Sequence, residues 1–103
     1  MIFETEPTGY EKTLLSDLQG VWQCLRDEVA SNPGFIGWDK ALFHIDEAMS
    51  WESVRNLRQM SRTLLLVRNL IQQGDPPKDV LECLNSVNEL MAETLEALDK
   101  HEI

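Results

Sequence analysis

Residues 51–73 carry hydrophobic side chains at helical spacing, and this spacing constrains the fold more than any other feature of the chain. A helix over this stretch would have one apolar seam, formed by Leu57, Met60, Leu64, Val67 and Ile71 at intervals of three and four residues. Leu65, Leu66 and Leu70 add apolar surface on the side away from that seam. A helix that is apolar on two sides is normally covered on two sides. We therefore expect one side to face the core and the other to face another helix or another chain.

Similar periodic patterns occur in three other segments, so the sequence predicts an all-α fold. A first helix is expected over residues 8–30, where Thr8 and Glu11 match a capping box, and a short second helix over residues 37–49. A final helix is expected over residues 77–100, after the helix-ending glycine Gly74. Ser50 is a candidate cap for the helix over 51–73, although the sequence leaves open whether this helix and the second one form a single bent rod. Gly20 lies inside the first helix, and a close approach by a neighbouring helix would explain it.

Four amphipathic helices with short connections pack as an antiparallel four-helix bundle, here with three long helices and one short helix. The short helix leaves part of one long face without cover, and dimerisation is the simplest remedy. The predicted organisation is a flexible arm over residues 1–7, a single helical-bundle domain over 8–100 and a frayed tail over 101–103.

The charge of the chain is strongly negative and unevenly distributed. The 103 residues have a formal net charge of −9, but residues 51–74 carry four arginines against one acid and are locally basic. Such acidity argues against direct nucleic-acid binding, which needs a basic footprint. No apolar run reaches the roughly 20 residues of a membrane helix, and the N-terminal residues are acidic where a signal peptide would be basic. With two cysteines placed inside predicted helices, the sequence indicates a cytoplasmic protein with reduced thiols.

The arginines of residues 51–74 suggest a partner-binding surface. Arg58 and Arg62 are one helical turn apart and have no acid to compensate them on their own helix, and tryptophan with arginine is enriched at interface hot spots. The predicted partner-binding residues are Trp51, Arg55, Arg58, Arg62, Leu65, Leu66 and Leu70. A solvated helix face with arginine stems covering apolar surface is the competing interpretation.

The function that this pattern favours is a small non-enzymatic protein–protein interaction module, acting as a homodimer or an adaptor and requiring no cofactor. If the dimer forms through this surface, Leu66→Glu combined with Arg62→Glu should give a folded monomer in light scattering. No phosphate-binding loop, nucleophile motif or metal-ligand framework is present in the sequence, and a single His44–Glu47 pair is a weak metal signal.

A row of glutamates on the last helix supports a second hypothesis. The row consists of Glu82, Glu89, Glu93 and Glu96. It could meet the arginines of a second copy, or it could block a basic partner such as a nuclease, as acidic inhibitor, immunity and nucleic-acid-mimic proteins of bacteria and phages do. Binding to a nuclease would weaken steeply with salt, whereas an apolar self-contact would respond little.

An enzymatic alternative rests on the same helix. All-α nucleotide pyrophosphohydrolases of the MazG kind hold Mg²⁺ with an EExxE and an ExxD pattern on two facing helices. Glu96 and Asp99, or Glu93 and Glu96, resemble the second half of that pattern. The first half is missing, because the acids at residues 46–47 are followed by Glu52 at the wrong spacing. A shift of the melting temperature by Mg²⁺ or Mn²⁺ would test this alternative.

Overall fold

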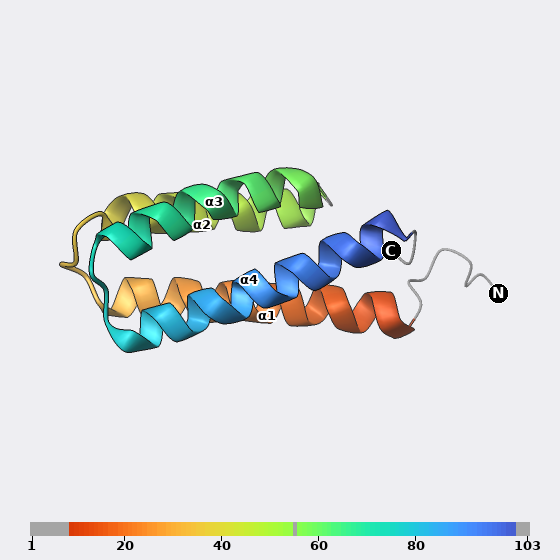
Figure 1. Cartoon of the computed structure of the whole chain (residues 1–103), viewed down its shortest axis with the longest axis horizontal. Coiled ribbons are helices and arrows are strands. Elements are labelled where there is room, and N and C mark those ends of the chain that lie inside the picture. Colours follow the sequence, from red (N-terminus) through yellow and green to blue (C-terminus); the bar gives the residue numbers. More distant parts are fainter. Residues whose placement is uncertain (1–8, 55, 101–103) are drawn as a thin grey trace.

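The computed structural model of the chain describes residues 9–54 and 56–100, with the side chains of residues 14–52, 54 and 56–100, and this part is all-α (Figure 1). The helices are α1 (Gly9–Ser31), α2 (Trp38–Ser53), α3 (Leu57–Gln73) and α4 (Lys78–Asp99). The predicted all-α class is therefore confirmed, and the helices pack side by side in a manner compatible with a bundle.

The helices run alternately up and down, so that each is antiparallel to the next in the chain (Figure 1). Helix α1 lies along α4, and the hairpin of α2 and α3 covers that pair. The contacts of α2 with α3 and of α1 with α4 are the most extensive, and the contact of α3 with α4 is the thinnest. This uneven packing leaves one side of the bundle less closely filled than the others.

The core lies between the two helix pairs and contains the seam predicted from the sequence. All five seam residues of α3 are at most 5% exposed. Helix α1 contributes Trp22, which is fully buried, and α4 contributes a matching apolar face. The buried hydroxyls of Thr63 and Thr94 donate to the backbone carbonyls of Gln59 and Leu90, at 3.1 Å and 2.7 Å. Because these hydroxyls have local acceptors, their burial leaves no unpaired donor.

The junction between α2 and α3 differs from the prediction. We expected a helix over residues 51–73 capped by Ser50, but α2 continues to Ser53 and α3 begins at Leu57. The side chain of Asn56 accepts a hydrogen bond from the backbone N–H of Gln59 and caps α3. The Ser50 hydroxyl instead donates back to the carbonyl of Glu47, as a residue inside a helix does. The two helices are thus separate elements, one ending at Ser53 and the other beginning at Leu57.

The helix lengths also differ from the prediction. Helices α1 and α4 have 23 and 22 residues, whereas α2 and α3 have 16 and 17, so the bundle combines two longer helices with two shorter ones. The reason is that Trp51, in the last turn of α2, packs against the core. Residues 51–53 therefore belong to α2, which becomes longer than expected, and α3 becomes shorter. The expectation of a single short helix is therefore wrong.

The structure contradicts the role expected of one glycine, Gly20, and supports the role expected of another, Gly74. A Cβ at Gly20 would have no neighbour within 4 Å, so no helix approaches closely there. Gly74 ends α3 as predicted, but its φ of −88° is ordinary, and its importance is steric. A Cβ at this position would lie 2.1 Å from the carbonyl oxygen of Ile36 in the α1–α2 connection. Only glycine allows the two connections at this end of the bundle to approach so closely.

Several predictions fall outside the described residues. They are the arm over 1–7, the capping box formed by the side chains of Thr8 and Glu11, the tail over 101–103 and the position of Arg55. Among the helices that are described, none is both long enough and apolar enough to cross a membrane.

Candidate functional site

The exposed face of α3 carries two adjacent leucines. Leu65 and Leu66 are 54% and 49% exposed, although both lie in the middle of a well-formed helix. Leu70, one turn further on, is half-buried and packs against the core cluster. The apolar surface that the bundle leaves uncovered on α3 therefore consists of Leu65 and Leu66, without Leu70.

Leu65 lies beside a groove between α3 and α4. The groove consists of two adjoining open hollows of about 190 Å³ and 200 Å³, which share Ser61 and Leu95. The first hollow is lined by Arg58, Ser61, Arg62 and Leu95. The second hollow is lined by Ser61, Leu64, Leu65, Arg68, Asn88, Met91, Ala92 and Leu95. This groove runs along the side of the bundle where the contact between neighbouring helices is thinnest.

The α3 side of the groove is basic and only partly neutralised. Arg58 forms an ion pair with Asp99 of α4, and both side chains are more than half exposed. Among the side chains that the structure describes, Arg62 donates only to the side-chain oxygen of Gln59, at 3.4 Å. An ion pair between such exposed groups contributes little to stability, about 0–1 kcal/mol. The arginines of α3 thus remain available to a negatively charged partner.

Two polar atoms at the groove lack hydrogen-bond partners. Nε of Arg68 and Oδ1 of Asn88 are both shielded from solvent, and neither has a partner among the described residues. Both residues line the second hollow, one from each helix. A buried polar group without a partner is unfavourable by about 1–3 kcal/mol, and native structures contain few of them. The groove therefore has an unpaired donor on α3 and an unpaired acceptor on α4.

The outer flank of α4 is acidic, in agreement with the glutamate row read from the sequence. Glu82, Glu89, Glu93 and Glu96 are all exposed. Glu82 and Glu96 lie 3.8 Å and 3.5 Å from lysines one turn away on the same helix. Glu89 and Glu93 form no ion pair within the described part of the chain. The groove is therefore lined by arginines on its α3 side, whereas the four glutamates lie on the exposed surface of α4 outside the two hollows.

The structure brings together some of the predicted partner-binding residues and separates others. Arg58, Arg62 and Leu65 share the groove. Leu66 is exposed but lines neither hollow. Trp51 belongs to α2, is half-buried against the core and has an indole nitrogen without a hydrogen-bond partner among the described residues. Trp51 therefore lies on a different helix from Arg58, Arg62 and Leu66, because α2 ends at Ser53 and α3 begins at Leu57.

The sequence reasoning missed Ser61 and Arg68 on α3 and the groove residues of α4. A signal for the α3 residues was present, because Arg58, Ser61, Leu65 and Arg68 follow one another at intervals of three, four and three residues. This is the spacing of a second helix face, beside the apolar seam. Grouping the arginines with Leu65 by this spacing would have identified the α3 side of the groove.

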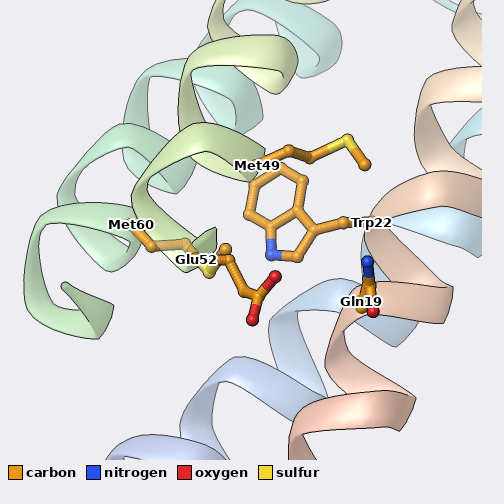
Figure 2. A pocket seen from close by; sticks show the side chains of 5 residues that line it. All are labelled: Gln19, Trp22, Met49, Glu52 and Met60. Carbon is orange, nitrogen blue, oxygen red and sulfur yellow. The ribbon is translucent and has the colours of Figure 1, made fainter. Parts of the chain in front are cut away.

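A small cavity in the core offers no comparable site. It is lined by Gln19, Trp22, Met49, Glu52 and Met60 (Figure 2). Figure 2 shows the carboxylate of Glu52 on the side of the indole that carries the nitrogen of Trp22, and that nitrogen has no partner among the described residues. The cavity measures about 30 Å³, whereas small-molecule sites usually measure about 300–1,000 Å³. We therefore regard it as a packing defect of the core.

The remaining titratable groups do not converge. His44 Nδ1 lies 2.9 Å from a carboxylate oxygen of Glu47, as their spacing of one turn allows. Within the described ranges, no three His, Cys, Asp or Glu side chains are grouped as they would be around a metal ion. Burial raises the pKa of the Cys83 thiol to about 12, and the neighbouring Cys24 side chain adds to this effect. A thiol with a raised pKa is a poor nucleophile at neutral pH.

Comparisons with known proteins do not assign the chain to a family: no protein-family model, curated protein or solved structure matches it. Any function must therefore be argued from the residues themselves.

Proposed function

We propose that this protein is a non-catalytic protein–protein interaction module that binds its partner through the α3 side of the α3–α4 groove. The observation that carries the proposal is Leu65, which is 54% exposed within the groove and has Arg58, Arg62 and Arg68 around it. Protein interfaces have apolar centres and are enriched in arginine, and arginine is also one of the residues enriched at interface hot spots. The free thiols of Cys24 and Cys83 support a reducing compartment such as the cytoplasm.

The energetics favour a protein partner over a small ligand. Covering the exposed half of Leu65 would contribute about 1 kcal/mol. The two hollows are open and adjoin along the helix axes, so that a ligand filling both must be elongated. A helix laid along a groove has this shape.

Site-specific photo-crosslinking tests the proposal. A photoreactive amino acid at Leu65 should give one discrete adduct in cells that naturally contain the protein, and the same group at Lys40, which is exposed on α2, should give none. Excess wild-type protein should compete for the adduct in an extract, and excess Leu65→Glu protein should not. If Leu65 yields no adduct, or the same adducts as Lys40, then the α3 surface binds no protein and the proposal is wrong.

The acidic flank of α4 favours a second candidate function, an inhibitor or nucleic-acid mimic that blocks a basic partner. Its support is the exposed row of four glutamates in a chain of net charge −9. Such a partner would crosslink to a photoreactive group at Glu93 in preference to Leu65. Its binding would weaken steeply as the salt concentration rises, because the contacts are between exposed charges.

A further inference from the structure

We propose that the α3–α4 groove is the contact surface of a two-fold dimer, in which α3 of each copy packs against α4 of the other. The inference rests on the proposed function and specifies its partner, a second copy of this chain. A two-fold contact uses the same surface on both subunits, so the surface must be complementary to itself. The α3–α4 surface meets this condition in the opposite charges that its two helices carry and in the positions of those charges along the helix axes.

Because α3 and α4 are antiparallel, each residue of α3 that lines the groove lies at the same height along the helix axes as a particular residue of α4. Arg58 pairs with Asp99 at one end of the groove, and Arg68 and Asn88 line its other part. Between them, Arg62 lines the same hollow as Leu95. Each basic residue of α3 is therefore level with a groove residue of α4.

Two of these α4 positions are followed in the sequence by a glutamate. Glu96 directly follows Leu95 and Glu89 directly follows Asn88, and both glutamates are exposed on α4 outside the two hollows. Arg62 is thus level with Glu96, and Arg68 is level with Glu89. A two-fold axis parallel to the helices and running along the groove leaves the height of every residue along the helix axes unchanged. The rotation places α4 of one copy opposite α3 of the other. The arginines of one copy then face the glutamates of the other, and the contact is repeated on both sides of the axis.

Charge complementarity favours a second copy over a foreign helix. An acidic helix would be attracted by the arginines of α3 but repelled by the exposed glutamates of α4. A basic helix would be attracted by the glutamates and repelled by the arginines. A second copy places its own glutamates opposite the arginines and its own arginines opposite the glutamates. The net charge of −9 on each chain opposes association only weakly, because repulsion beyond about 8 Å is screened at physiological ionic strength.

Arg68 and Asn88 line the groove from opposite walls. Nε of Arg68 and Oδ1 of Asn88 are shielded inside each subunit, so these two atoms take no part in the contact. After the two-fold rotation, the Arg68 side chain of one copy lies over the Asn88 side chain of the other. The half-exposed Leu65 lies between these polar contacts and becomes the apolar centre of the interface.

Sedimentation equilibrium of the full chain tests the dimer, and the neighbouring leucines provide a matched pair. Leu65→Glu should weaken dimerisation by about tenfold or more, because it places a charge at the centre of the contact. Leu66→Glu makes the same change at a residue of similar exposure outside the groove, and it should change the dissociation constant by less than about twofold. Circular dichroism melting of each variant establishes that it is folded.

A charge exchange tests the orientation. Arg62→Glu and Glu96→Arg should each weaken the dimer, because each places like charges opposite one another, and the double variant should regain most of the lost affinity. Failure of the double variant to recover, or equal effects of Leu65→Glu and Leu66→Glu, would overturn the inference.

The outcome also separates this inference from the proposed function. A wild-type chain that remains monomeric, but still crosslinks from Leu65 to a different protein, refutes the dimer and leaves the binding module in place. A monomer that gives no adduct from Leu65 refutes both.

Discussion

Helix α4 contacts α1 on one flank and α3 on the other, and the two contacts are built in opposite ways. Against α1 the contact is extensive, and the thiol of Cys83 is buried there beside Cys24. Against α3 the contact is thin and bordered by hollows, by an exposed ion pair and by two unpaired polar atoms. The same helix thus holds the fold together on one flank and leaves the other available for binding. This division predicts that substitutions on the two sides will affect different properties.

The largest expected effect is on the packed side of the bundle. Trp22→Ala removes a fully buried indole and should lower the free energy of unfolding by about 3–5 kcal/mol. Leu65→Ala in the groove should change it by less than about 0.5 kcal/mol, measured at a protein concentration low enough to suppress association. Urea titrations followed by circular dichroism compare the two. Equal losses would show that the groove side is part of the stabilising core.

An intermediate effect is expected from the pKa of Cys83. Burial raises the pKa of this thiol from 9.0 to about 12, so between these values the unfolded chain loses a proton that the folded chain keeps. In this pH range the folded state therefore binds more protons than the unfolded state. The free energy of unfolding falls as the pH rises from about 9 to 12, by at most about 1.4 kcal/mol per pH unit. Below pH 9 the thiol is protonated in both states, and the contribution to stability is fully present.

The measurement for Cys83 is the difference between wild type and Cys83→Val in denaturant titrations over this pH range. The difference isolates Cys83 from the lysines that titrate nearby. Cys24→Ser leaves Cys83 buried, and since burial is the largest cause of the shift, this variant should keep most of the pH dependence. A wild-type curve parallel to that of Cys83→Val would mean that the α1–α4 contact does not shield the thiol.

The smallest effect is expected at the ion pair that crosses the groove. Arg58→Ala should lower the free energy of unfolding by only about 0–1 kcal/mol, because the side chains of Arg58 and Asp99 are 58% and 62% exposed. A double-mutant cycle with Asp99→Ala measures the coupling, which should shrink further at high salt. A coupling above about 1 kcal/mol would mean that this pair contributes more to holding α3 against α4 than its exposure implies.

The sequence predicted the buried faces of the helices well, because burial follows directly from helical spacing. The seam of α3 is one example, since every residue assigned to it is buried. It predicted the α2–α3 junction poorly, because Ser50 and Asn56 are both good capping residues and local chemistry does not choose between them. We attribute the position of the junction to Trp51, because this side chain packs against the core when it belongs to the end of α2. Such a contact depends on tertiary packing and is not visible in a local pattern.

The candidate site was predicted in part for a similar reason. Exposed leucines and arginines on α3 could be read from periodicity, and Arg58, Arg62 and Leu65 do lie together. The α4 half of the groove could not be read, because it depends on which helix lies beside α3 and at what level. Asn88 and Leu95 have nothing unusual in their own segment of sequence. Their significance comes from facing Arg68 and Ser61 across the groove.

The order of contacts around the bundle has a consequence for how the chain folds. Helices α1 and α2, α2 and α3, and α3 and α4 are neighbours in both sequence and space, and only the contact of α1 with α4 joins distant parts of the described chain. Local contacts form quickly, whereas bringing the two outermost helices together requires closing a loop that spans most of the polypeptide. We therefore expect the docking of α4 on α1 to limit the folding rate, and a shorter α2–α3 connection to matter less than a weakened α1–α4 contact.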